Sequence, residues 1–282
     1  MTTQAEPGRQ PLAAAGRAIE PIARSLTVGS LAGFIAGLIA GGIGSRIAMR
    51  ITAIAAGGRF RGAITDAEET VGEITADGTI FLVLFAGLIG GFGGLIYLGV
   101  RRWVADAGRW RGLAFGVVLL AMFGWAIIEG DNPDFHRFGP PALNIAMFAS
   151  IYILFGLLVA PLFELIERVL PRPSLRLGGL AGLAAYGFAL LITVPILGAA
   201  ANGFGAEGDN REFFSLLPLY ALLVVPIAAL LLARAAGRFE RLSDLRGQQW
   251  AMAAALAVLT LPVVLGSVLG VVAVADIFEA NR

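Results

Sequence analysis

The segment GSLAGFIAGLIAG, residues 29–41, contains no charged residue and has a glycine at every fourth position. These glycines are Gly29, Gly33, Gly37 and Gly41. Four residues are close to one turn of an α-helix, so the four glycines share one helical face. A row of small residues on an apolar helix lets a second backbone pack closely against it. The segment therefore predicts a membrane-spanning helix with a glycine packing face.

Six further segments of the chain also lack charged residues. Charged residues make up only 15% of the 282 residues, whereas about 25% is typical of a soluble domain, and they gather in short clusters between these segments. Each segment can cross the ~30 Å hydrocarbon core of a bilayer as a helix, and none has the polar stripe of a soluble helix. We therefore expect an all-α integral membrane protein with seven transmembrane helices, at about residues 26–56, 66–100, 112–128, 142–168, 177–200, 213–236 and 247–275.

The distribution of arginine predicts the orientation. All 21 basic residues are arginines, and alternating the segments between the two sides places fourteen of them on the side of the N-terminus. The positive-inside rule puts that side in the cytoplasm and the C-terminus outside. We expect residues 1–25 to form a cytoplasmic tail, 26–276 a single membrane domain and 277–282 an outer tail. The composition is typical of a multi-pass protein of a bacterial plasma membrane.

A short sequence pattern occurs twice in the loops expected outside. Residues 129–135 and 207–213 both read E-G-D-N-x-[DE]-F, and each follows an odd-numbered helix. The repeat favours two related hairpins, helices three–four and five–six, arranged in parallel about an axis along the membrane normal. A chance match is the alternative, because the flanking helices align only through Gly, Ala and Leu.

The second predicted helix carries two overlapping pairs of glycines four residues apart. They are Gly87 with Gly91 and Gly90 with Gly94. The simpler interpretation is a tight hairpin between the first two helices. The alternative is a face that binds a partner helix, a lipid or a flat pigment. The candidate packing face comprises Gly29, Gly33, Gly37, Gly41, Gly87 and Gly91.

Two arginines follow the first uncharged segment. Arg46 and Arg50 are four residues apart and share one helical face. They either reach the outer interface and pair with nearby carboxylates, or form an anion site at the outer mouth of the bundle. The polar residues of the later loops are more simply interpreted as helix caps. The candidate outer polar site comprises Arg46, Arg50, Glu69, Glu73, Asp131, Asp134, His136 and Asp209.

At the inner end of the fourth predicted helix, Glu164 and Arg168 are four residues apart. This spacing predicts an ion pair within the helix.

Missing residue types exclude several cofactors. The chain has no lysine, which excludes a retinal Schiff base, and no cysteine, which excludes a thiolate metal site. His136 is the single histidine, so bis-histidine haem ligation within the chain is excluded as well. The composition leaves any other cofactor undetermined.

The uncharged segments carry no ionisable residue at their midpoints, which argues against ion-coupled or proton-coupled transport. We expect an accessory or scaffold subunit of a membrane complex. The alternatives are a passive transporter or channel for a small solute, and an intramembrane lipid-acting enzyme that uses outer carboxylates such as Glu129 and Asp131. Expected partners are the lipid bilayer and other membrane subunits or a second copy, bound through the first two helices; no nucleic acid is expected.

Overall fold

The computed structural model describes residues 9–57, 62, 76–130, 132, 135, 139–171, 180–202 and 245–281. Within these residues all regular secondary structure is helical, which confirms the prediction of an all-α chain. The predicted helix 213–236 lies outside the described residues. The main helices are α1 (Arg9–Gly37), α2 (Gly44–Ala55), α3 (Ala76–Val104), α4 (Arg111–Phe123), α6 (Pro141–Val169), α7 (Leu180–Asn202) and α10 (Leu245–Ala280).

Four helical stretches are long and apolar enough to cross a membrane. They are Ala23–Ala55, Gly78–Phe123, Pro141–Val169 and Thr260–Ala280, and a shorter apolar stretch, Gly182–Ile192, lies within α7. The described residues therefore have the helices of a membrane protein, in agreement with the sequence.

The stretch Gly78–Phe123 contains two helices rather than one. A 3₁₀ turn, Ala105–Trp110, joins α3 to α4, and Gly108 in this turn has a φ of 54°. A side chain is strained in this left-handed conformation, whereas glycine adopts it freely. Gly108 therefore allows the chain to reverse direction between α3 and α4.

The first helix is longer than expected from the sequence. It begins at Arg9, inside the expected tail 1–25, and continues through a π-helix, Leu38–Ile43, into α2. It ends at Ala55, one residue before the expected boundary, and Gly57 follows with a φ of 67°. A glycine in this conformation is a common helix terminator.

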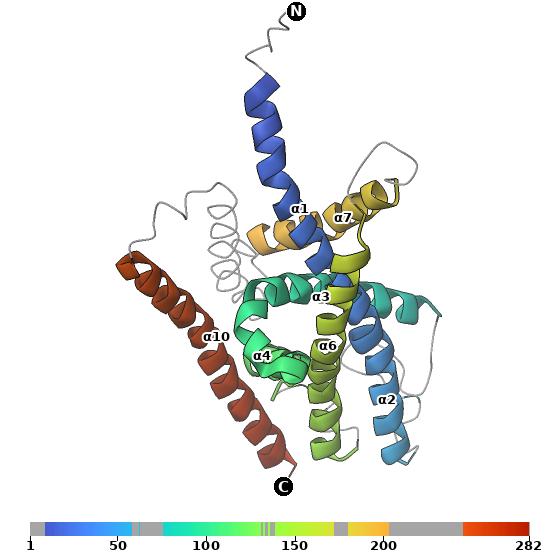
Figure 1. Cartoon of the computed structure of the whole chain (residues 1–282). Coiled ribbons are helices and arrows are strands. Elements are labelled where there is room, and N and C mark those ends of the chain that lie inside the picture. Colours follow the sequence, from blue (N-terminus) through green and yellow to red (C-terminus); the bar gives the residue numbers. More distant parts are fainter. Residues whose placement is uncertain are drawn as a thin grey trace, which may run out of the picture.

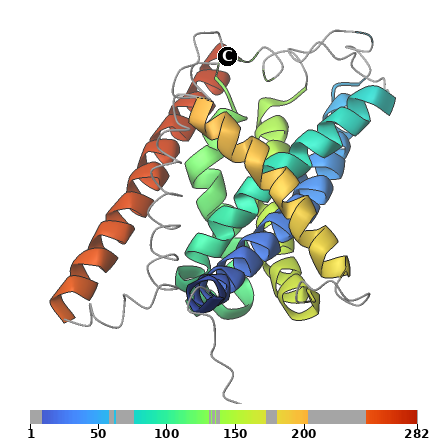
Figure 2. The same cartoon turned by 90° about the horizontal axis from the view of Figure 1, so that it is seen from above.

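Helices α1 and α3 form an antiparallel pair. Gly29 of α1 lies opposite Gly94 of α3, and further along α1 Gly37 lies opposite Ala86. Helix α7 contacts both helices and crosses them obliquely (Figures 1 and 2). The ring of Phe188 in α7 meets the ring of Phe34 in α1 edge to face, with centroids 5.2 Å apart.

Helix α4 is antiparallel to α6 and parallel to α10. Gly112 of α4 lies against Leu157 of α6, whereas the later residue Gly116 lies against the earlier residue Ile153. By contrast, Gly266 of α10 lies against Met122 of α4, and the later α10 residue Asp276 lies against Gly130, which follows α4. Helix α10 stands at one side of the bundle (Figure 2).

The core lies between α1, α3, α4 and α6, around Tyr97 of α3. The Tyr97 ring packs edge to face against Phe115 of α4 and Phe163 of α6, with centroids 5.0 and 5.5 Å apart. Helix α1 contributes small side chains instead of rings. Three alanines of this first helical stretch are buried beside the glycine row: Ala32, Ala36 and Ala40. Because their side chains are small, α1 can lie close to the neighbouring helices.

Candidate functional site

The structure describes two members of the candidate outer polar site, Arg46 and Arg50 of α2. Arg46 is half-buried, and its Nε atom is buried without an acceptor among the described residues. Arg50 is exposed. The other six members lie outside the described residues: Glu69, Glu73, Asp131, Asp134, His136 and Asp209. The described structure therefore does not test whether these eight residues come together.

The described part of the loop between α4 and α6 packs against α10 and α6. Phe135 is 3% exposed and forms a small apolar cluster with Ile128 and Ile277. Its ring lies 5.4 Å from the ring of Phe148, centroid to centroid. Phe135 therefore holds this part of the loop against α6 and α10.

The glycine row of α1 faces the backbone of α3. A Cβ atom on Gly33 would lie 2.6 Å from the amide nitrogen of Gly94 and would also meet the carbonyl oxygen of Gly90. A Cβ on Gly37 would lie 2.8 Å from the Cα of Gly90. Contacts this short between backbones are available only to glycine, so this part of the helix pair depends on the glycine row.

The two glycine pairs of α3 have different surroundings. Gly90 and Gly94 face the α1 backbone, whereas a Cβ on Gly87 would meet side chains, 2.8 Å from atoms of Phe34 and Leu38. Gly91 is buried. The closest backbone approach therefore involves Gly90 and Gly94, of which neither belongs to the candidate face.

A second small-residue contact joins α4 to α6. A Cβ on Gly156 of α6 would lie 2.5 Å from the amide nitrogen of Gly116 and would also meet the carbonyl oxygen of Gly112. Gly112 and Gly116 are four residues apart, the same spacing as in α1. This spacing is the sequence signal from which a close contact of α4 could be predicted.

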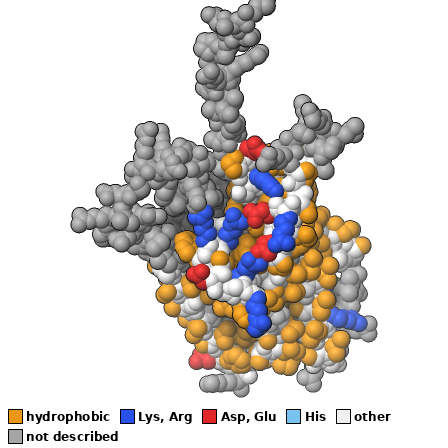
Figure 3. Space-filling model, in the orientation of Figure 1, with side chains coloured by type: hydrophobic (Ala, Val, Ile, Leu, Met, Phe, Trp, Pro, Cys, Tyr) orange, Lys and Arg blue, Asp and Glu red, His pale blue; other side chains and the backbone are white. Residues whose placement is uncertain are grey.

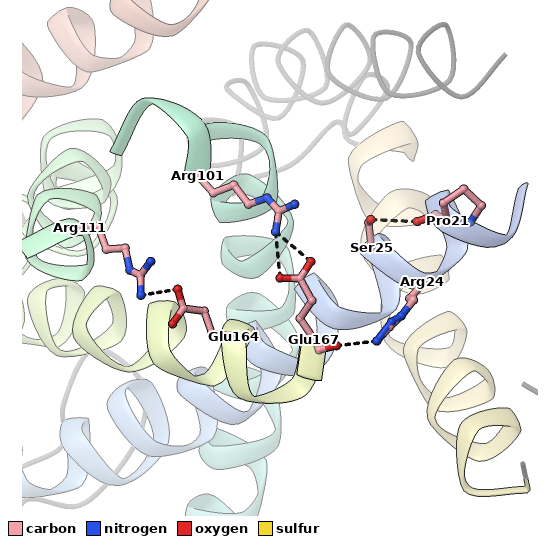
Figure 4. Close-up of polar contacts among 7 residues, drawn as sticks. All are labelled: Pro21, Arg24, Ser25, Arg101, Arg111, Glu164 and Glu167. Atoms are coloured by element: carbon pink, nitrogen blue, oxygen red, sulfur yellow. Dashed lines mark hydrogen bonds and ion pairs between the residues drawn. The ribbon is translucent and has the colours of Figure 1, made fainter. Parts of the chain in front are cut away.

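The most extensive polar arrangement described lies at the C-terminal end of α6. Figure 4 shows Glu164 paired with Arg111 of α4 and Glu167 paired with Arg101 of α3. The latter pair is 3.2 Å apart. Arg168 lies 3.9 Å from Glu164, so the expected pair within α6 is present, but Glu164 also pairs with another helix.

Arg24 of α1 joins the same end of α6 through backbone atoms. Its Nη2 donates hydrogen bonds to the carbonyl oxygens of Glu167 and Leu170, at 2.5 and 3.2 Å. The last carbonyl groups of a helix have no partner within the helix, and a cationic donor there also interacts favourably with the helix dipole. Arg24 therefore caps α6 from a neighbouring helix.

We name this arrangement the α6 end cluster; it consists of Arg24, Arg101, Arg111, Glu164, Glu167 and Arg168. In Figure 3 charged side chains gather in one region of the displayed face, and hydrophobic side chains cover much of the rest. The cluster links α1, α3 and α4 to α6. Its interhelical pairs explain why charge is concentrated at this end of the described helices.

The described residues contain no group of three or more His, Asp or Glu side chains that could hold a metal ion. Comparison with protein-family models, curated proteins and solved structures finds no match to the chain. The arguments about function therefore rest on the packing and the charges of the helices.

Proposed function

We propose that the chain is a seven-helix protein of a cell membrane and acts as an accessory or scaffold subunit of a membrane complex. The proposal rests on the contacts that charged side chains make between helices at the end of α6. Glu164 and Glu167 bind arginines of two other helices, and Arg24 of a third helix caps α6. These polar groups hold helices together, as a framework requires.

The relative directions of the helices support a total of seven membrane crossings. Because α4 and α10 are parallel, an odd number of membrane crossings separates them. Helix α6 is long and apolar enough for one crossing, and the uncharged windows 177–206 and 213–233 are each long enough for another. With α1 and α3 before them, the total is seven, which places the N- and C-termini on opposite sides of the membrane.

The close helix contacts support a framework role. Glycine lets α1 approach α3 and lets α4 approach α6 at backbone distance, and the rings of Tyr97, Phe115 and Phe163 fill the core between these pairs. Packing of this kind stabilises a fixed arrangement of helices. The large apolar side chains exposed on α3 and α10 then remain available to lipid and to partner helices.

Native mass spectrometry of the protein extracted from its own membrane tests the proposal. We expect a stable assembly in which the 29.4 kDa chain is bound to a second polypeptide at fixed stoichiometry. The chain produced without its native partners is the control and should lack that polypeptide. A monodisperse 29.4 kDa monomer from the native membrane would reject the subunit role.

A passive path for a small solute is the second candidate, favoured by one local feature. The π-helix Leu38–Ile43 interrupts the first spanning helix three residues before Arg46, whose Nε has no described acceptor. π-Helical turns are frequent at functional sites. Liposome flux measurements on Arg46→Ala and Asp131→Ala test this candidate, and full flux in both variants would reject an outer site at these residues.

A further inference from the structure

The turn between α3 and α4 combines exposed aromatic rings with cationic side chains. Trp103 and Trp110 are 40% and 55% exposed. The guanidinium carbon of Arg109 lies 5.0 Å from the centroid of the Trp110 ring, a cation–π arrangement. Indole rings favour the headgroup level of a bilayer, so these two tryptophans place the turn at the membrane–water interface.

Arg109 differs from Arg101 and Arg111 in its surroundings. Arg101 and Arg111 bind the carboxylates of Glu167 and Glu164, which reduces their positive field. Arg109 is exposed and has no carboxylate within ion-pair distance among the described residues. Its guanidinium therefore lies beside Trp110 with no described carboxylate to neutralise it.

Positive charge exceeds negative charge at the end of the bundle that contains this turn. Among the residues whose side chains the structure describes, this end has six arginines and four carboxylates, which leaves a surplus of two positive charges. With the same restriction, the opposite end has Arg46 and Arg50 against Glu129, Asp276 and Glu279, a surplus of one negative charge. The residues counted at the positive end are Glu20, Arg24, Arg101, Arg102, Asp106, Arg109, Arg111, Glu164, Glu167 and Arg168.

We propose that the α3–α4 turn binds the headgroup of an anionic phospholipid, with Arg109 as the principal hydrogen-bond donor to its phosphate. A guanidinium presents several N–H groups in a plane and matches the oxygens of a phosphodiester. Trp110 then lies at the glycerol level beneath the phosphate, held against Arg109. The positive surplus at this end favours a lipid with net negative charge over a zwitterionic lipid.

Lipid titration followed by native mass spectrometry tests the proposal on the full chain. The probes are phosphatidylglycerol and phosphatidylcholine of matched acyl chains. One arginine near a membrane surface contributes about 1 kcal/mol to anionic lipid binding, which corresponds to about a fivefold change in affinity. We expect phosphatidylglycerol to bind the wild type about fivefold more tightly than phosphatidylcholine, and Arg109→Gln to abolish this preference.

Arg50→Gln is the matched control, because Arg50 is also an exposed arginine but lies at the other end of the bundle. It should retain the preference, whereas Arg109→Glu should reverse it. Excess inorganic phosphate distinguishes a lipid site from a phosphate site and should leave lipid binding unchanged. Equal lipid affinities in the wild type, an unchanged preference in Arg109→Gln, or full displacement by phosphate would each overturn the proposal.

Discussion

Arg24 of α1 and Glu167 of α6 are 143 residues apart in sequence, yet the Nη2 of Arg24 donates a hydrogen bond of 2.5 Å to the Glu167 carbonyl oxygen. The same atom donates to the carbonyl oxygen of Leu170 at 3.2 Å. The end of α6 thus receives donors that its own backbone cannot supply. One side chain therefore connects the first spanning stretch, Ala23–Ala55, to the end of α6.

Replacing Arg24 by alanine should destabilise the bundle. The two carbonyl groups lie near the surface, where water replaces the lost donors, so we expect a loss of about 1 kcal/mol. Thermal unfolding in detergent measures the effect. Ser25→Ala is the neighbouring control, because the Ser25 hydroxyl donates only to Pro21 of the same helix, at 2.9 Å. An equal loss in both variants would contradict the cap.

The ion pair between Arg111 and Glu164 should show a measurable coupling energy. Both side chains are about one-third exposed, at 35% and 33%, so solvent weakens the pair and we expect about 1 kcal/mol. A double-mutant cycle with Arg111→Gln and Glu164→Gln, followed by thermal unfolding, measures it. Arg168 is 78% exposed and 3.9 Å away, so Arg168→Gln should change stability far less. A coupling energy of zero would remove the α4 link from the α6 end cluster.

Gly33→Ala should destabilise the pair of α1 and α3. The new methyl group would lie 2.6 Å from the backbone nitrogen of Gly94, and overpacking of this kind costs about 1–3 kcal/mol. Gly187→Ala in α7 is the matched control, because a Cβ there meets nothing within 4 Å. Thermal unfolding should show a lower midpoint only for Gly33→Ala. Equal stability of the two variants would contradict the backbone contact.

Cysteines at positions 130 and 276 should form a disulfide bond between the loop after α4 and helix α10. A Cβ on Gly130 lies 3.0 Å from the Cβ of Asp276, and a small adjustment gives the distance of about 3.8 Å that a disulfide needs. The chain has no cysteine of its own. Oxidation of Gly130→Cys/Asp276→Cys, analysed by the shift of the band on a non-reducing gel, should give efficient cross-linking.

Gly187→Cys/Asp276→Cys is the control for random collision, because Gly187 has no described neighbour within 4 Å. It should remain reduced under the same conditions. Cross-linking in the control alone would mean that α10 does not pack along α4 in the direction described.

Composition was sufficient to predict the four spanning helices that the structure describes, because uncharged apolar segments have few alternatives in a bilayer. The uncharged segment 25–45 lies within the stretch Ala23–Ala55, and 138–163 largely coincides with α6. The glycine spacing of α1 indicated a packing face. It could not select the partner residues on α3, because Gly87 with Gly91 and Gly90 with Gly94 have the same spacing and differ only by a rotation of the helix.

The α6 end cluster was harder to predict than the helices. The pair within α6, Glu164 with Arg168, follows from local spacing, but the contacts of Arg24 and Arg111 depend on how separate helices align. Helix alignment is set by packing along the whole length of each helix, which no short motif specifies. The contacts between helices in the α6 end cluster therefore depend on the three-dimensional arrangement of α1, α3, α4 and α6.

The sidedness of two positions tests the seven-crossing bundle most directly. Arg109 precedes α4 and Glu279 lies in the last turn of α10; because α4 and α10 are parallel, these residues lie at opposite ends. Single cysteines at the two positions can be labelled in intact cells with a membrane-impermeant maleimide. We predict labelling at position 279 from outside and at position 109 only after permeabilisation. Labelling of both positions from the same side would contradict the seven-helix arrangement.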